Sequence, residues 1–391
     1  MMNWKGLHSM NARTSEDKFL FWMASCFFAV NFLNLIAWSL GFHVSPLVFG
    51  AAFLIFVLGS FLDLKKNWMV LAIVSCVIFI ILGVPLTHWD ARHIWFFHAK
   101  RIFVDNNLYT QLDNYFPESH NDYPVLVPAI AASFAKGLGF WNEIFPRLSI
   151  LPVLIPIFLV LRILFKRHFS FAVAVLGTLF VSKQLLVDGY MDAILGLYIA
   201  VACLLLEKCE EKSEYSWLIW IFLALPMIKN EGVLALLLLL ISFFFIFRHR
   251  KVLWLGPIAT CFIYYFLWKR PVAISGIQTT DLFVSGILDR ALKRLSSGSD
   301  LLEIFLSMVK VSGVYFVALW TVVGLSRKGL VPAFFTAFYT LAMYGVYLIT
   351  TLDLHEHLSH SVDRVLLPVN LTILLTLVDA LLERESKIQV R

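Results

Sequence analysis

Residues 87–103 place ionisable side chains among aromatic ones directly after a long apolar run, in the sequence "THWDARHIWFFHAKRIF". Read as a helix from Trp89, this stretch puts Asp90, His93 and Arg101 on one stripe. Aromatic and basic side chains suit the boundary between water and lipid, and an interfacial anchor accounts for most of them. A carboxylate gains nothing from anionic headgroups, so Asp90 is the first candidate for chemistry, with His93 beside it.

Two aspartate-bearing segments follow. In "ESHNDYPVLVP", Asp122 and Tyr123 come just before Pro124, which suits the start of a helix that Asp122 would cap. In "LVDGYMD", Asp188 and Asp192 lie at the start of another apolar segment. Capping or a loop position explains these aspartates as well as a role in a binding site does, so both interpretations stay open.

The segment "PMIKNEGVLALLLLL" interrupts an otherwise unbroken apolar region with Lys229, Asn230 and Glu231. Ionisable groups at membrane depth are costly, and they usually pair with one another or face a cavity. A tight hairpin exposed to water is the structural alternative. The turn has no surplus length, and Pro226 and Gly232 break the helices on either side, which favours a binding site.

The last cluster, "HEHLSHSVDRVLLP", contains His357, His360 and Arg364. Imidazoles and carboxylates are zinc ligands, so a divalent metal is conceivable here, although the spacing HxHxxH matches no familiar metal motif. Arg364, at the top of the final apolar run, is typical of a clamp for phosphate or carboxylate. A polar loop without function is the alternative. No cofactor is otherwise indicated.

The composition decides what kind of element positions these groups. Of 391 residues, 60% are hydrophobic and only 15% are charged, against about 25% charged in soluble domains. We therefore expect an all-α polytopic integral membrane protein, with residues 1–391 forming a single transmembrane domain. The five cysteines show no CxxC spacing, which argues against a disulfide framework or a thiolate metal site. The net charge of +6 reflects membrane topology, and no basic block indicates a nucleic acid.

Apolar runs of about 20 residues recur from end to end and predict about twelve spans. They cover residues 19–41, 45–63, 68–86, 145–165, 169–187, 190–206, 216–228, 232–248, 252–268, 302–325, 330–350 and 364–381. Residues 87–144 form a large loop with interfacial helices, and residues 269–301 form a second loop. The stretch 123–140 is apolar but short, so it either spans the membrane or lies in the interface.

The distribution of basic residues orients this arrangement. With a cytoplasmic N-terminus and with 123–140 not crossing, 17 of the 32 lysines and arginines lie in inner segments and 11 in outer ones. Both termini are then cytoplasmic, and the polar N-terminal segment has no signal-peptide cleavage site. Every polar cluster described above falls on the outer face. We therefore expect a cytoplasmic-membrane protein whose site faces the periplasm or exterior.

The order of these motifs resembles the GT-C superfamily of polytopic glycosyltransferases. The resemblance rests on "WDARHIWFFHAKRIF", "HNDYPVLVP", an aspartate-bearing turn, "KNEG" and a late "DRVLLP", covering roughly residues 87–370. The superfamily includes protein O-mannosyltransferases and the aminoarabinose transferase of lipid A. Two extra spans precede the first large loop here, where many members have one span, and no large periplasmic domain follows the last span, which leaves the acceptor class open.

The resemblance implies transfer of one sugar from a polyprenyl-phosphate donor to a lipid, glycan or protein acceptor, by single displacement with inversion. Asp90 would be the general base, and Lys100, Arg101 and Arg364 would stabilise the departing phosphate. The remaining candidates would bind substrate: His93, Asp122, Tyr123, Asp188, Asp192, Lys229, Asn230, Glu231, His357 and His360.

Two other functions remain open at this stage. A polymerase or ligase of the O-antigen type would be expected to depend on outer-loop arginines, and residues 269–301 contain Arg270, Arg290 and Arg294. A transporter or flippase would also carry intramembrane charge. However, no matched half-sequences are visible, and the polar groups gather at one face instead of the membrane midplane, where transport sites lie.

Overall fold

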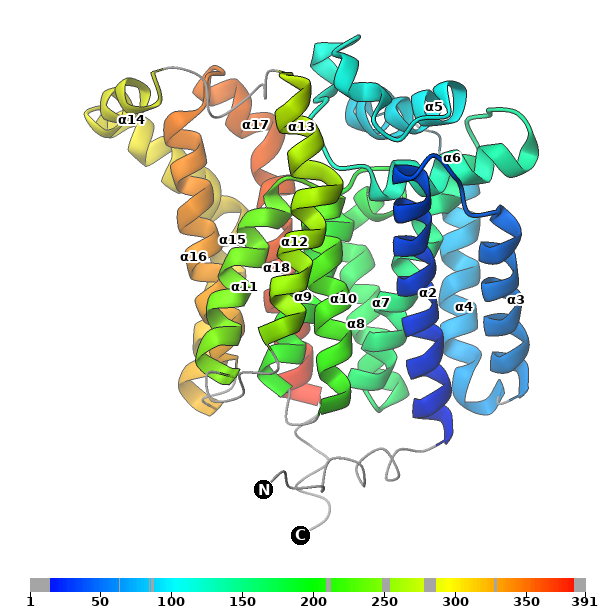
Figure 1. Ribbon diagram of the computed structural model, residues 1–391. Coiled ribbons are helices and arrows are strands. Elements are labelled where there is room, and N and C mark those ends of the chain that lie inside the picture. The colour runs from blue at the N-terminus through cyan, green and yellow to red at the C-terminus, as the bar shows by residue number, and fades with distance from the viewer. Residues whose placement is uncertain are drawn as a thin grey trace.

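The computed structural model describes residues 15–62, 64–83, 85, 88–208, 212–247, 254–277, 286–326 and 329–382. This part of the chain folds into helices and contains no strand. Long helices run side by side in a bundle, and short helices cover one end of it (Figure 1). The prediction of an all-α protein with apolar, membrane-type helices is confirmed.

The bundle helices coincide with the predicted spans. They are α2 (Ser15–Ser39), α3 (Pro46–Leu62), α4 (Leu64–Gly83), α7 (Ile150–Leu164), α8 (His168–Ser182), α9 (Asp192–Lys208), α10 (Lys212–Ile228), α11 (Glu231–Phe247), α12 (Leu255–Tyr264), α15 (Gly298–Ser326), α16 (Leu330–Ile349) and α18 (Leu367–Leu382). Within the described ranges, six helical stretches are by themselves long and apolar enough to cross a membrane: Lys18–Ser39, Phe145–Leu164, His168–Leu186, Gly298–Gly324, Leu330–Ile349 and Leu354–Leu382. The count of twelve crossings stays a prediction.

The short elements include η2 (Ala91–Trp95), α5 (Phe96–Asp105), η3 (Thr110–Asp113), η4 (Pro117–Ser119), α6 (Leu126–Leu138), η5 (Phe145–Ser149), η6 (Lys183–Leu186), η8 (Tyr265–Lys269), α13 (Arg270–Ser275), α14 (Ile287–Leu295) and α17 (Leu354–Val365). Figure 1 shows α5, α6, α14 and α17 at the same end of the bundle. We call this the capped end. The polar segments that were predicted to share one face therefore lie at one end of the molecule.

The ambiguous stretch 123–140 forms the short helix α6 at the capped end (Figure 1). Its 13 residues extend about 20 Å, which is less than the roughly 30 Å of a hydrocarbon core. Two buried hydrogen bonds attach α6 to α2: Trp38 Nε1 donates to Ser133 Oγ at 2.8 Å, and Ser133 Oγ donates to Asn34 Oδ1 at 2.7 Å. The first large loop is thereby fixed to the first bundle helix.

Helix α9 lies at the centre of the bundle, with every residue from Asp192 to Leu206 buried. A helix that is apolar on all sides is stable only when other helices surround it, and α9 packs against α7, α10, α16 and α18. Its closest neighbour is α18, because a Cβ at Gly196 would lie 3.2 Å from the backbone of Pro368. Asp192 and Arg364 each lie four residues before these two positions, Arg364 near the end of α17, so this packing brings two predicted site residues towards each other.

Candidate active site

A polar cleft of about 1020 Å³ opens at the capped end of the bundle. It lies where the start of the first large loop, the η6 segment and the α17–α18 junction meet. Its walls include His88, Trp89, Asp90, Lys183, Gln184, Tyr190, Glu356, His360, Asp363 and Arg364. Three of these residues, Asp90, His360 and Arg364, were predicted site residues.

Asp90 and Arg364 form an ion pair in this cleft, although 274 positions separate them in the chain. Arg364 Nη1 donates a hydrogen bond to Asp90 Oδ2, and the guanidinium also lies over the ring of Tyr190, 4.9 Å from its centroid. Both side chains remain about a quarter exposed, at 24% for Arg364 and 23% for Asp90. Asp90 precedes η2 but makes no capping hydrogen bond with its side chain. Helix capping therefore does not account for this carboxylate.

Behind the cleft, Lys229 joins two carboxylates in a buried cluster. Lys229 Nζ lies 2.8 Å from Asp192 Oδ1 and 2.8 Å from Glu231 Oε1. The side chains of Lys229 and Asp192 are only 8% and 5% exposed. Burial opposes the charge on Lys229, but the two carboxylates outweigh it and raise its pKa well above the ordinary value. The simple water-exposed hairpin proposed as the alternative for "KNEG" is wrong, because Lys229 is enclosed.

The two clusters interact through Asp192. Its charge acts on Lys229 and on Arg364, so the central carboxylate stabilises a cation on each side. Desolvated ion pairs need such additional partners to offset the loss of hydration. Asp90 contacts Arg364, and Lys229 contacts Asp192 and Glu231, while Asp192 acts on Arg364 through space. We call these five residues, whose charges alternate in sign, the row of charges.

Asp122 and Tyr123 also lie beside this row. Asn230 Nδ2 donates to Asp122 Oδ2 at 2.8 Å, and Lys229 Nζ lies 5.9 Å from the ring centroid of Tyr123. The predicted capping of a helix by Asp122 is wrong, because α6 begins at Leu126 and Val125 occupies its N-cap position. Asp122 instead connects the first large loop to the "KNEG" turn.

Asp188 is buried at the edge of the cleft and pairs with a residue that the sequence analysis did not single out. His88 Nε2 lies 3.4 Å from Asp188 Oδ2, and the His88 ring also contacts Gln184 and Tyr190. Burial raises the pKa of Asp188 to about 6, and His88 only partly opposes that shift. The signal that could have identified His88 was its place in "HWDARH", two residues before Asp90.

Arg101 and Lys100 are not brought into the cleft with Arg364. Arg101 forms a two-pronged pair with Asp113, at 2.8 and 2.7 Å, and also donates to Asp105 at 3.1 Å. The Asp113 hydrogen bond raises the pKa of Arg101, and Arg101 lowers the pKa of Asp113. Lys100 is exposed on α5. The arrangement makes Arg101 a structural residue of the loop.

Two further histidines of the first loop, His93 and His98, have structural surroundings. His93 Nδ1 lies 3.1 Å from the carbonyl oxygen of Trp89 and stacks on the Trp89 ring, with centroids 4.8 Å apart. His98 is fully buried, its Nε2 is 3.2 Å from Ser119 Oγ, and burial lowers its pKa to about 3. His98 is therefore neutral near pH 7, as a core residue of the loop.

The late histidine cluster does not converge on one point. His355 pairs with Glu303 at 2.7 Å, and His357 Nδ1 lies 2.8 Å from Thr350 Oγ1. His360 lines the cleft, and its carbonyl oxygen accepts a 3.3 Å hydrogen bond from Arg364 Nε. Within the described ranges, no group of three His, Cys, Asp or Glu residues is arranged to hold a metal ion.

The arginines of the second loop contact the end of helix α16. Arg294 Nη1 donates to the carbonyl oxygens of Tyr347 and Thr350 at 2.7 and 3.0 Å, and Arg290 Nε donates to that of Ile349 at 2.8 Å. These bonds satisfy carbonyl groups that a helix end leaves without intrahelical partners. Arg270 lies over the ring of Phe266. Residues 278–285 of this loop lie outside the described residues.

Comparisons of the chain with protein-family models, curated proteins and solved structures give no match. The chemistry of the cleft is therefore argued from its own residues. It offers the carboxylates of Asp90, Glu356 and Asp363, of which Asp90 is paired with Arg364, the arginine that can bind an oxyanion, and it is large enough for a sugar-sized ligand.

Proposed function

We propose that this protein is a membrane glycosyltransferase of the GT-C type, which transfers one sugar from a polyprenyl-phosphate donor to an extracytoplasmic acceptor. The observation that carries the proposal is the pairing of Asp90 with Arg364 in a polar cleft at the capped end. A base and an anion-binding group within one cleft are what such a transfer needs.

In the proposed reaction, the donor phosphate binds Arg364 and competes with Asp90 for the guanidinium. Asp90 is then free to accept the proton of the acceptor hydroxyl while that oxygen bonds to the anomeric carbon. The bond from the anomeric carbon to the phosphate oxygen breaks, and the polyprenyl phosphate leaves with the electron pair. One displacement inverts the anomeric centre. Arg364 stabilises the charge that develops on the departing phosphate.

The buried cluster of Asp192, Lys229 and Glu231 would support this chemistry by acting on Arg364. Asp192 acts on Arg364 and is itself balanced by Lys229, which holds Glu231 as well. Such a row keeps Arg364 charged and oriented after its bond to Asp90 is lost. Asp122, Asn230 and Tyr123 extend the same region towards the first loop and would contact the sugar or the acceptor.

The proposal includes the membrane placement. Twelve spans with both termini in the cytoplasm would put the capped end at the periplasmic or outer surface of the cytoplasmic membrane. A lipid-linked donor presents its phosphate and sugar at that boundary. Figure 1 shows α17 at the end of the bundle instead of halfway along it, and residues of α17 line the cleft. A transport pathway would need a site near the midplane.

The polymerase or ligase alternative receives less support. It depends on arginines of residues 269–301, and Arg290 and Arg294 donate to the carbonyl groups at the end of α16. That use favours a structural role for them over binding of a pyrophosphate carrier.

The test uses purified protein in detergent with polyprenyl-phosphate sugars and a pool of acceptors. We expect donor consumption by the wild type and a fall of about 10²–10⁴-fold in the Asp90→Asn variant, the usual contribution of a general base. Arg92→Ala, which alters a charge on the same helix but outside the cleft, is the matched control and is expected to retain activity. Wild-type rates in Asp90→Asn would exclude Asp90 as the base. No consumption of any donor by the wild type would favour a transporter.

A further inference from the structure

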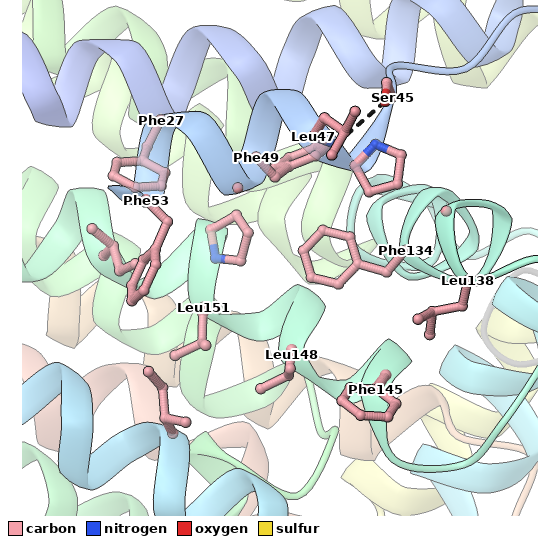
Figure 2. A pocket seen from close by; sticks show the side chains of 16 residues that line it. Phe27, Ser45, Leu47, Phe49, Phe53, Phe134, Leu138, Phe145, Leu148 and Leu151 are labelled. Atoms are coloured by element: carbon pink, nitrogen blue, oxygen red, sulfur yellow. Dashed lines mark hydrogen bonds between the residues drawn. The ribbon is translucent and has the colours of Figure 1, made fainter. Parts of the chain in front are cut away.

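An apolar groove of about 600 Å³ lies between α2, α3, α4, α6 and α7, away from the polar cleft. Figure 2 shows aromatic and aliphatic side chains from these helices around it, among them Phe49, Phe53, Phe134 and Leu148. Helices α6 and α3 pack closely at the groove, because a Cβ at Gly137 would lie 2.0 Å from the Pro46 ring. We call this the α3–α7 groove.

The rim of the α3–α7 groove is open and apolar. Leu47 is 80% exposed, Phe145 is 47% exposed and Leu138 is 41% exposed. In a membrane-spanning helix bundle, such side chains face the hydrocarbon region. The groove is therefore accessible to a lipid chain from the side.

A basic pocket of about 420 Å³ lies next to the groove along the same two elements. On α4, Ile78 lines the groove and Leu82, one turn later, lines the pocket. On η5, Phe145 and Leu148 line the groove and Arg147 lines the pocket, as does Ile144 just before η5. Residues three or four positions apart share one face of a helix, so the groove and the pocket lie next to each other along the same face of α4.

The charges of the pocket favour an anion. Its walls carry Arg92, Arg147 and Glu143. Arg147 is buried, donates to the carbonyl oxygen of Leu82 at 3.4 Å, and is balanced by Glu143. Arg92 is exposed, so its positive charge is the surplus in the pocket.

We propose that the α3–α7 groove and the basic pocket together bind one anionic phospholipid of the bilayer. A hydrocarbon chain occupies the groove, and the headgroup phosphate lies against Arg92 and Arg147. Hydrophobic burial holds the chain, and charge-assisted hydrogen bonds select the headgroup.

This site is separate from the polar cleft. Asp90 and Arg92 are two positions apart in helical backbone, and residues at that spacing do not face each other. The residues that line the pocket and the cleft do not overlap. A phosphate beside Arg92 does not reach Asp90, which is why the occupant is a bilayer phospholipid and not the sugar donor. The assignment of a lipid to the groove and pocket rests on their own residues, and only the exclusion of the sugar donor rests on the proposed function.

The experiment is native mass spectrometry of the full-length protein in detergent, titrated with phosphatidylglycerol, phosphatidylcholine or polyprenyl phosphate. We expect one phosphatidylglycerol to be retained at lower concentration than phosphatidylcholine. Arg92→Ala should weaken phosphatidylglycerol binding about tenfold and leave phosphatidylcholine unchanged, as the loss of a charge-assisted hydrogen bond predicts.

A second variant tests the groove. Gly50 lines it, and a Cβ there meets nothing within 4 Å, so Gly50→Phe fills the groove without a backbone clash. This variant should weaken binding of both phospholipids. The matched controls are Lys100→Ala, an exposed charge outside the pocket, and Gly324→Phe, at a glycine with equally open surroundings, and both should bind as the wild type does.

Equal affinity for both phospholipids, or no effect of Arg92→Ala, would overturn the headgroup assignment. No effect of Gly50→Phe would overturn the assignment of the chain. Preference for polyprenyl phosphate over phosphatidylglycerol would make the occupant the donor class and contradict the proposal, as would a protein dimer that forms in place of the lipid complex.

Discussion

The two ion clusters at the capped end have the same chemistry but differ in their access to water. Asp90 and Arg364 are each about a quarter exposed, whereas Lys229 and Asp192 are almost fully enclosed. A pair that water reaches is held less firmly and can exchange partners, while a fully buried pair is expensive to break. The same types of side chain therefore suit ligand exchange in the cleft and support behind it.

The largest expected effect is on the buried cluster. Lys229→Met removes the cation that Asp192 and Glu231 both contact and should lower the free energy of unfolding by about 3–5 kcal/mol. Thermal unfolding followed by tryptophan fluorescence measures this loss, with Lys100→Met as the exposed control. A variant as stable as the wild type would mean that breaking the enclosed cluster costs no more stability than breaking the open one.

Loss of the Asp90–Arg364 pair should affect activity more than stability. Arg364→Met should reduce transfer about 10²–10³-fold, because it removes a donor to the departing phosphate, yet change stability by only about 1 kcal/mol. Initial rates and the unfolding temperature, measured on the same preparation, separate the two effects. An equal fall in stability from Arg364→Met and Lys229→Met would abolish the distinction between the clusters.

The buried Asp188 should make the stability of the protein depend on pH. Its folded pKa of about 6 exceeds the ordinary 3.8, so the protonated form is favoured in the folded protein. The stability that this provides is complete below pH 4, is lost as the pH rises to 6, and stays lost above. The Asp188→Asn side chain stays neutral at every pH. The free energy of unfolding of this variant should therefore equal that of the wild type near pH 4 and exceed it by at most about 3 kcal/mol at pH 7. Unfolding temperatures across this range test it, and a constant difference would contradict the assignment.

The smallest effect is expected at Arg101. Its pairing with Asp113 at the surface should be worth about 0–1 kcal/mol. Arg101→Met should leave the KM for the donor within about twofold of the wild type, since the residue lies outside the cleft. The KM for the donor, measured for Arg101→Met and Arg364→Met in parallel, tests this expectation. A tenfold rise in KM would restore Arg101 as a phosphate ligand.

Hydropathy predicted the helices well, because a bilayer requires long apolar segments that are visible within the chain itself. It could not locate the start of α6. Pro124 and Asp122 carry the usual signals for a helix start, but Asp122 instead accepts a hydrogen bond from Asn230, 108 residues away.

The candidate site was predicted in part for the same reason. Asp90 and Arg364 stood out as charges beside apolar runs, and the structure brings them together. Arg101 stood out equally but pairs within its own loop, and His88 did not stand out at all. Residue type indicates what a side chain can bind, whereas the choice among several partners is made by packing between distant helices.

The hydrogen-bond chain from Trp38 through Ser133 to Asn34 affects how fast a ligand can enter the cleft. It fixes one side of the first large loop to α2, and Trp268 Nε1 fixes another side by donating to the carbonyl oxygen of Asp122 at 2.9 Å. A loop held at two places does not lift as a lid, which would take microseconds to milliseconds. Admission of a phosphate to the cleft then requires only that the Arg364 side chain leaves Asp90 and changes rotamer, which is a movement of one side chain and not of the loop.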